Sequence, residues 1–440
     1  MTITLTVPPR TDSSRLAGLP VAVIGAGPVG LAAAAHLLER GLDVVVFELG
    51  ERAGSAVADW AHVRLFSPWT YLLDPAAVRL LESTGWSAPE GERSPTGAEL
   101  LDTYLTPLAS TPALEPRIRL NSRVIAASRQ GMDRTRSTGR ADTPFLLRVE
   151  HDGTVADVLA RAVVDTSGTW RSPNPLAADG LTPSTGTCRQ VVTGIPDVLG
   201  RDRERFAGKR VLVVGAGHSA ANSLLALGRL ARDEPGTSIG WAIRTPSATR
   251  VFTADGDELP DRASIGRDVD ALVQAGTIGL VDRFEIDAVE TAPDGVAVRV
   301  HGRRGGESHD IDADVVVNAT GFRPALELLR EIRLSLDDVV EAPRVLAPLI
   351  DPNLHSCGTV PPHGVAELSH PEPNFFIAGM KSYGRAPTFL LATGYEQVRS
   401  IADELAGHHA AARLVTLVLP ETGVCSSGGD CCTPDDATCC

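Results

Sequence analysis

The stretch Val21-Ala22-Val23-Ile24-Gly25-Ala26-Gly27-Pro28-Val29-Gly30 decides the fold predicted for this chain. Its first four residues are apolar, as in a buried parallel strand, and its glycine-rich remainder leads into an alanine-rich segment that favours a helix to about Arg40. A second apolar run over residues 43–47 ends at Glu48. Strand, glycine turn, helix and strand in this order predict a βαβ unit of the kind that binds a dinucleotide.

The same order of elements recurs about 190 residues later. Residues 210–214 form the expected strand, Gly215-Ala216-Gly217-His218-Ser219-Ala220 forms the turn, and the next strand ends at Arg244. After each unit, apolar and polar residues alternate as in antiparallel strands, and a β-branched strand then leads to a glycine turn at Gly168 or Gly321. This internal repeat predicts two dinucleotide-binding domains.

We therefore predict an α/β fold with two Rossmann-like domains, each with an antiparallel β-meander, in which the second domain is inserted into the first. Residues 374–407 return to strand, turn and helix and are expected to complete the first domain. The predicted units are a flexible N-terminus at 1–15, a discontinuous first domain at 16–190 and 312–424, a second domain at 191–311, and a flexible cysteine-rich tail at 425–440.

The first glycine turn has the residues that a dinucleotide pyrophosphate requires. Gly25 permits the tight turn, Gly27 lets the backbone approach the phosphates, and Gly30 lets the helix pack on the strand. Glu48 is placed to accept hydrogen bonds from a ribose diol. A glycine turn that serves only packing is the alternative, but the agreement of strand, spacing, helix and acid favours cofactor binding.

The second turn differs at two positions. Ala220 stands where the third glycine would be, a change that the dinucleotide-binding pattern allows. Arg244 replaces the acid, and its guanidinium can pair with the 2′-phosphate of NADPH, which a carboxylate would repel. The sequence thus favours NADPH over NADH, with a solvated strand end as the alternative for Arg244.

Composition argues against several classes of partner. The chain has 440 residues and a net charge of −14 without a clustered Lys/Arg face, so nucleic acid and anionic membrane are poor partners. The N-terminus has no signal-peptide pattern, and glycine, proline and histidine interrupt the apolar residues 19–38. A cytoplasmic protein without a membrane span is therefore expected.

From about residue 19 to residue 407 the chain resembles two-domain flavoproteins, a group that includes flavin-containing monooxygenases, Baeyer–Villiger monooxygenases and glutathione-reductase-like enzymes. The resemblance rests on GAGPVG with Glu48, GAGHSA with Arg244, NATGF at 318–322 and FFIAGMKSYGRAPTFLLATGYEQ at 375–397. It implies FAD in the first domain and NADPH in the second. The cofactor-binding residues predicted from the motifs and the resemblance are Gly25, Gly27, Pro28, Val29, Gly30, Glu48, Ser67, Trp69, Val124, Gly168, Gly215, Gly217, His218, Ser219, Ala220, Arg244, Gly321, Gly379 and Thr388.

Two segments fit an isoalloxazine site within this resemblance. Ser67 and Trp69 offer a hydroxyl and a flat ring, and Arg385 is placed to hold NADPH or a developing negative charge. A core position for Trp69 and a surface ion pair for Arg385 are the alternatives. The chain also departs from the patterns of these enzymes. No cysteine precedes Cys188, which argues against the flavin-proximal disulfide of the glutathione-reductase-like enzymes. Residues 191–197 lack the Phe and His of the monooxygenase signature.

Five of the seven cysteines lie in the last sixteen residues, including Cys431, Cys432, Cys439 and Cys440. Soft thiolates select soft ions, so these four are candidate ligands for trivalent arsenic, mercury or copper(I), with incidental thiols in a disordered end as the alternative. With such a tail the chain resembles the flavin monooxygenases of bacterial arsenic-resistance clusters.

The sequence thus predicts an NADPH-dependent FAD monooxygenase that uses O₂ and oxygenates a small soft nucleophile, such as sulfur, nitrogen or trivalent arsenic, through a flavin peroxide. One alternative is an NADPH-dependent reductase of a metal or a disulfide that uses the tail thiols. The other is a non-catalytic flavoprotein whose tail binds a soft metal.

Overall fold

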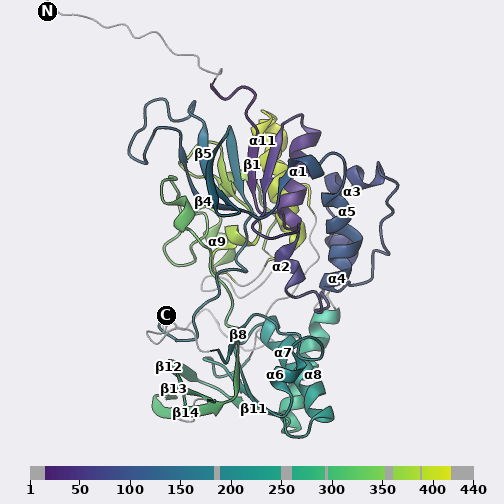
Figure 1. The fold of residues 1–440 in the computed structure, drawn as a ribbon, viewed down its shortest axis with the longest axis vertical. Coiled ribbons are helices and arrows are strands. Elements are labelled where there is room, and N and C mark those ends of the chain that lie inside the picture. The colour runs from purple at the N-terminus through teal and green to yellow at the C-terminus, as the bar shows by residue number, and fades with distance from the viewer. Residues whose placement is uncertain are drawn as a thin grey trace, which may run out of the picture.

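In a computed structural model of the protein, the described residues are 15–182, 189–248, 260–292, 296–351, 360–386 and 389–417, with side chains from residue 264 onward in the third range. They form two lobes stacked along the long axis of the molecule (Figure 1). Each lobe contains a five-stranded parallel sheet and a three-stranded antiparallel meander. The predicted α/β fold with two Rossmann-like units is confirmed.

The sheet of the upper lobe is built around the strand of the first glycine motif. β1 (Val21–Ile24) pairs with β2 (Val44–Phe47) on one side and with β7 (Ala162–Asp165) on the other, in the order β16-β7-β1-β2-β3. Val21 and Val23 pack with the helical layer, and Ala22 and Ile24 pack with the meander. The other elements of these layers are α1 (Pro28–Glu39), β3 (Ile118–Arg119), β4 (Ser122–Arg129), β5 (Phe145–His151), β6 (Thr154–Ala160), β16 (Phe375–Ile377) and α11 (Leu391–Leu405).

A helical segment between β2 and β3 flanks the upper lobe, on the right in Figure 1. Its apolar side chains, among them Leu81 and Leu105, join the same buried cluster as α1. The elements of this segment are α2 (Ser55–Ala58), η2 (Trp69–Tyr71), α3 (Pro75–Glu82), α4 (Gly97–Leu100), η3 (Leu101–Leu105), α5 (Thr106–Ala109) and η4 (Glu115–Arg117).

The sheet of the lower lobe has the order β11-β10-β9-β15-β8. β15 (Val315–Asn318) pairs in parallel with β9 (Arg210–Val214), so it belongs to this sheet. The predicted boundary at 311/312 is therefore wrong, because it assigns β15 to the first domain; we propose that the second domain extends through β15. The other elements are β8 (Val191–Thr193), α6 (Arg203–Phe206), α7 (His218–Asp233), β10 (Ser238–Ala242), α8 (Pro260–Gln274), β11 (Ile278–Val281), β12 (Phe284–Thr291), β13 (Val298–Arg304) and β14 (Glu307–Ala313).

The two chain segments that join the lobes run side by side. The Asn174 N–H donates to the Gly321 carbonyl at 2.9 Å, and the Arg323 N–H donates to the Ser172 carbonyl at 2.9 Å. The Asn318 amide also donates to the Asn174 carbonyl at 2.8 Å. These bonds join the outgoing and returning segments into one two-stranded connection.

After β15 the chain returns to the upper lobe and completes its sheet with β16. Glu372, just before β16, accepts hydrogen bonds from Arg129 and Arg140 in a fully buried cluster, which ties the meander to the sheet. Within the described ranges, no helix has both the length and the apolar composition needed to cross a bilayer. The last elements are η5 (Glu327–Leu329), α9 (Ala347–Ile350), α10 (Val365–Leu368), η6 (Gly379–Tyr383) and α12 (His409–Ala412).

Candidate functional site

A cleft of about 510 Å³ runs along the carboxyl ends of the upper sheet. One end lies beside Glu48, which follows β2, and Val124, in β4. The other end lies beside Gly168 and Gly379, which follow β7 and β16 on the opposite side of β1. The cleft therefore has the position of a dinucleotide site that crosses the strand-order switch at β1, with lining residues on both sides of that strand.

The first glycine turn forms the middle of this cleft. Gly25 has φ +98°, which favours glycine, and a Cβ on Gly30 would lie 1.9 Å from the Gly25 carbonyl oxygen. A Cβ on Gly27, by contrast, would meet no atom within 4 Å, and Gly27 lines the cleft. Gly25 and Gly30 thus serve the local fold, whereas the missing side chain of Gly27 leaves space for a ligand.

Three long helices begin without a side-chain cap beside the predicted cofactor turns. These are α1 at Gly27, α7 at Gly217 and α11 at Leu390, and none of them has an acidic residue in its first turn. Two helices away from these turns do have side-chain caps: the Asp74 carboxylate caps α3, and Thr96 with Glu99 forms a capping box on α4. The short helices α2, α5, α6, α9 and α12 have none. Uncapped N–H groups and the positive end of the helix dipole favour an anion, as a pyrophosphate requires.

Glu48 is positioned by the turn that it faces. Its carboxylate accepts hydrogen bonds from the Ala26 N–H at 2.8 Å and the Gly50 N–H at 2.9 Å, and it lines the cleft. Each carboxylate oxygen has a second acceptor site, so the group can still bind a ribose diol. Leu49 and Ile125 lie beside it with 46% and 36% of their surface exposed, an apolar face of the kind that an adenine ring covers.

The opposite end of the cleft is walled by two loops. Residues Thr166–Gly168 follow β7, and Gly379 and Met380 begin η6 after β16. The Thr166 hydroxyl donates to the Ile24 carbonyl at 2.9 Å, which fixes this loop against the glycine turn. The residues of the cleft therefore fit both halves of a dinucleotide, as FAD would require.

A buried hydrogen-bond chain holds the Gly379 turn. The Gln397 carbonyl oxygen accepts from the Gly379 N–H at 2.8 Å, so the Gln397 amide nitrogen faces Ser382 Oγ at 3.0 Å and His363 Nε2 at 2.8 Å. His363 must then be neutral, with Nε2 accepting from Gln397 and Nδ1 donating to the Pro361 carbonyl at 3.0 Å. Burial lowers the pKa of His363, although the Pro361 hydrogen bond opposes the shift.

The second glycine turn repeats this geometry in the lower lobe. Gly215 has φ +133°, and a Cβ there would lie 2.2 Å from the Ala319 carbonyl oxygen. A Cβ on Gly217 would meet no atom within 4 Å. Ala220 is fully buried, as its helix-packing position predicts, and Arg244 is exposed just after β10. His218 starts α7, and its ring lies 5.4 Å from Phe66 of the upper lobe.

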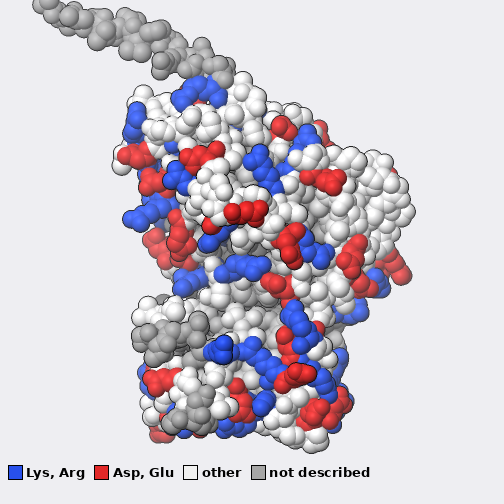
Figure 2. Space-filling model, in the orientation of Figure 1, with Lys and Arg blue, Asp and Glu red and all other residues white. Residues whose placement is uncertain are grey.

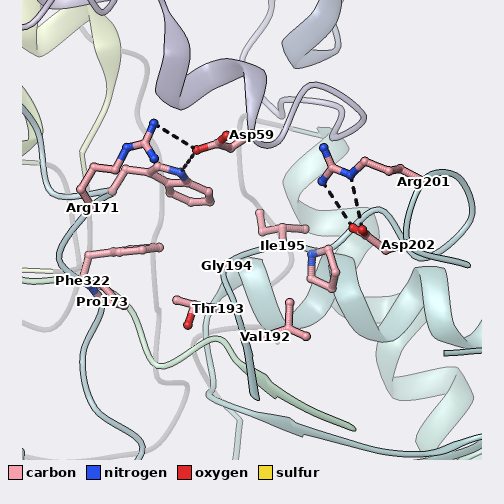
Figure 3. Close-up of a pocket in the computed structure, with 12 residues that line it drawn as sticks. Asp59, Arg171, Pro173, Val192, Thr193, Gly194, Ile195, Arg201, Asp202 and Phe322 are labelled. Atoms are coloured by element: carbon pink, nitrogen blue, oxygen red, sulfur yellow. Dashed lines mark hydrogen bonds and ion pairs between the residues drawn. The ribbon is translucent and has the colours of Figure 1, made fainter. Parts of the chain in front are cut away.

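Between the lobes lies a second cavity of about 350 Å³ (Figure 3). Trp170 Nε1 donates to Asp59 at 2.8 Å, and the Trp170 ring lies 4.9 Å from the Phe322 ring. Arg171 is 3.7 Å from Asp59, and Figure 3 shows both on the upper side, opposite Val192 and Thr193 of the lower lobe. Trp170 and Arg171 also line the cleft at the carboxyl ends of the upper sheet, called the cofactor cleft below, so the two cavities share a wall.

Two predicted catalytic residues lie away from both cavities. Trp69 is fully buried in the core of the helical flank, and Ser67 is buried in the same segment without lining the cleft. Arg385 points outward and pairs with Glu341 at 2.5 Å. The structure therefore places Trp69 in the core and Arg385 in a surface ion pair, as the alternatives for these two residues expect. The roles predicted for Ser67, Trp69 and Arg385 toward a cofactor stay predictions.

The remaining predicted site residues divide by location. Thr388, Cys431, Cys432, Cys439 and Cys440 lie outside the described residues, so their roles stay predictions. Gly321 lies at the connection between the lobes. The sequence interpretation missed Trp170 and Asp59, which line the interdomain cavity, and Lys381, which is buried beneath the cleft. The position of Trp170, two residues after the Gly168 turn, was a usable signal.

Residues 20–250, more than half of the chain, match the model of a family described as FAD dependent oxidoreductase. The chain belongs to the FAD-dependent oxidoreductase family. It is thus a flavin-dependent enzyme, and its predicted resemblance to two-domain flavoproteins is confirmed. Over 187 residues it is 29% identical to an Arabidopsis thaliana protein named as a flavin-containing monooxygenase, FMO GS-OX-like 10. That match covers 37% of this chain and 39% of the plant protein.

Solved structures of two-domain flavoproteins share the fold. Bacillithiol disulfide reductase from Bacillus cereus has a TM-score of 0.65 at 20% identity, over 89% of this chain and 99% of its own. The ornithine N-hydroxylase of Kutzneria sp. 744 has a TM-score of 0.58 at 17% identity, with the same coverage. A flavin monooxygenase from Stenotrophomonas maltophilia has a TM-score of 0.55 at 22% identity, over 89% and 98% of the chains. These likenesses concern the fold alone.

Proposed function

We propose that this FAD-dependent oxidoreductase is an NADPH-dependent monooxygenase that oxygenates a small soft nucleophile, at sulfur, nitrogen or trivalent arsenic. NADPH supplies two electrons, one oxygen atom of O₂ enters the substrate, and the other leaves as water with a proton from solvent. Bound FAD supplies the redox chemistry, and the protein positions the cofactor and excludes water.

The observation that carries the proposal is the convergence of the two dinucleotide folds on one cavity. With adenosine placed at Glu48, the flavin half of FAD extends toward β7, where Trp170 and Arg171 follow Gly168. With the adenosine of NADPH at Arg244, the nicotinamide half extends toward β15 and β8, where the cavity wall includes Thr193. Both reactive rings would therefore meet at the shared wall.

The sequence around the two cofactor turns favours oxygen transfer over disulfide chemistry. No cysteine precedes Cys188, and none lies in the second glycine turn. The cavity wall combines aromatic, aliphatic and paired charged side chains, which suits a small organic or metalloid substrate held near a flavin. The monooxygenases among the relatives and fold neighbours are consistent with this choice.

NADPH is proposed over NADH because of the charge at the second strand end. Arg244 is exposed just after β10, the position from which a side chain reaches the ribose of a dinucleotide bound at Gly217. The exposed guanidinium can form a bidentate, charge-assisted contact with a 2′-phosphate. The cysteine tail adds trivalent arsenic to the proposed substrates on chemical grounds alone.

The test is a substrate screen with purified, FAD-loaded enzyme, with and without O₂. A thioether, a primary amine, arsenite and a monomethyl arsenical are offered, and NADPH oxidation, O₂ uptake and product are measured. The proposal expects one substrate to give product only in the presence of O₂. NADPH oxidation that yields only hydrogen peroxide with every substrate would contradict it.

A reductase of a metal or a disulfide is the second candidate, supported by the tail cysteines and by the fold shared with bacillithiol disulfide reductase. The same screen separates the two functions. A reductase would oxidise NADPH with a disulfide or Hg²⁺ in the absence of O₂, and replacement of the tail cysteines by serine would abolish that activity.

A further inference from the structure

A buried ion pair lies directly beneath the flavin end of the cleft. Lys381 Nζ is 2.7 Å from Asp165 Oδ2, and both side chains are 0% exposed. Asp165 is the last residue of β7, and Lys381 follows Gly379 and Met380 in η6. The pair therefore joins the two loops that wall this end of the cleft, although neither of its residues lines the cleft itself.

Stability of the fold alone does not explain why this site holds an ion pair. Removing two charges from water costs several kcal/mol per ion, and apolar residues of similar size often stabilise such a site equally well. The chain also avoids lysine: only Lys209 and Lys381 occur among its 41 Lys and Arg residues. One of these two is placed where solvent does not reach. Lysine differs from arginine in presenting a compact ammonium with three donors, without a planar fork.

The third member of the cluster faces the cleft. Lys381 Nζ donates to Ser167 Oγ at 3.1 Å, and Ser167 Oγ donates to Asp165 Oδ1 at 2.7 Å. The Ser167 N–H donates to the same carboxylate oxygen at 3.0 Å. Ser167 is exposed and lines the cleft. The buried charges thus fix both the side chain and the backbone of a residue on the cofactor surface.

The lower lobe contains the same turn without a lysine. Asn318 ends β15, and its Oδ1 accepts from the Thr320 N–H at 3.2 Å and the Thr320 hydroxyl at 2.7 Å. Its amide nitrogen donates to the Asn174 carbonyl at 2.8 Å. A side-chain oxygen alone therefore suffices to form the turn. What Lys381 adds in the upper lobe is the connection from this turn to η6.

We infer that Lys381 is a positioning residue for the flavin half of FAD. Together with Asp165 it clamps the loop after β7 to the start of η6, and so sets the positions of Ser167 and Gly379 against the cofactor. This inference rests on the assignment of the cleft to FAD. It predicts that loss of the clamp weakens contacts at the flavin end and leaves the adenosine end intact, because Glu48 and Val124 lie on the other side of β1.

The test uses the full-length protein stripped of FAD, with FAD and ADP as separate probes. ADP reports on the adenosine end, and the visible spectrum of bound FAD reports on the flavin environment. Lys381→Met should raise the Kd for FAD about tenfold or more and shift the flavin absorption bands, with the Kd for ADP within about twofold of the native value. Lys209→Met, at an exposed lysine, is the matched control and should change neither Kd nor the spectrum.

Lys381→Met leaves a buried carboxylate without its partner and can fail to fold for that reason. The double variant Lys381→Met/Asp165→Asn removes both charges and reproduces the turn of the lower lobe. It should fold and bind ADP normally while retaining the weakened FAD binding and the shifted spectrum. A double variant with native FAD affinity and spectrum would overturn the inference, and so would equal losses for ADP and FAD. A native protein that binds neither probe would instead overturn the cleft assignment, and this inference with it.

Discussion

Gly27→Ala and Gly30→Ala form a matched pair that separates cofactor binding from packing. Both add one methyl group within three residues of the same turn. At Gly27 the backbone is extended, with φ −75° and ψ −176°, and the added Cβ meets no protein atom within 4 Å. At Gly30 the added Cβ lies 1.9 Å from the Gly25 carbonyl oxygen and 2.7 Å from Thr166 Oγ1.

The expected magnitudes follow from these contacts. The apoprotein of Gly27→Ala should keep its free energy of unfolding to within about 0.5 kcal/mol, because no contact or backbone strain is introduced. In the presence of FAD the methyl group would displace the pyrophosphate from at least one helix N–H. A charge-assisted hydrogen bond of about 1.5–3 kcal/mol corresponds to a rise in the Kd for FAD of about 10- to 150-fold. Gly30→Ala should instead destabilise the apoprotein by about 1–3 kcal/mol through overpacking.

The assay is denaturant unfolding of both apoproteins together with FAD titration by flavin fluorescence. The reasoning expects Gly27→Ala to lose affinity without losing stability, and Gly30→Ala to lose stability. Native FAD affinity in Gly27→Ala would refute the placement of the pyrophosphate at this turn. A destabilised Gly27→Ala apoprotein would refute the conclusion that the space around a Cβ at position 27 is free of protein atoms.

Three other predictions test separate parts of the molecule. Arg244→Ala should raise the KM for NADPH about 10- to 150-fold and change the KM for NADH little, because only NADPH has the 2′-phosphate; equal changes would show that Arg244 does not select the cofactor. Truncation after Gly423 should leave the melting temperature and FAD content unchanged and raise the KM for a trivalent arsenical, and an unchanged KM would make the tail cysteines incidental. The free energy of unfolding should fall as the pH falls from about 6.5 toward about 4, because burial holds the pKa of His363 below its ordinary value and that of His370 at about 4. These neutral histidines contribute stability above their unfolded pKa and lose it as the pH falls through the folded one, so a free energy of unfolding that stays constant from pH 7 to pH 4 would contradict this account.

The parts of the fold that sequence reasoning captured are those set by local rules. The strand, glycine turn, helix and following acid lie within about 30 residues, so Gly25, Gly27 and Glu48 could be placed from spacing alone. The membership of β15 could not be placed in this way. Both sheets receive a strand with the same pattern after a meander, and only the pairing of β15 with β9 decides between them.

The parts that escaped prediction depend on contacts between distant residues. Lys381 and Asp165 are 216 positions apart, and Arg385 and Glu341 are 44 apart. An aromatic ring near a motif fits a core or a ligand site equally well. Trp69 was predicted beside the flavin but lies in the core, whereas Trp170 was not predicted and lines the interdomain cavity. Surface charge was simpler to anticipate: Figure 2 shows acidic and basic side chains interspersed over the visible face of both lobes.

Oxygen-isotope incorporation tests the central claim most directly. FAD-loaded enzyme, NADPH and the best substrate of the screen are incubated under ¹⁸O₂, and product and NADPH oxidation are quantified. The account predicts one ¹⁸O atom in each product molecule and about one product for each NADPH oxidised. Product whose added oxygen comes from water, or substrate conversion that continues without O₂, would contradict it.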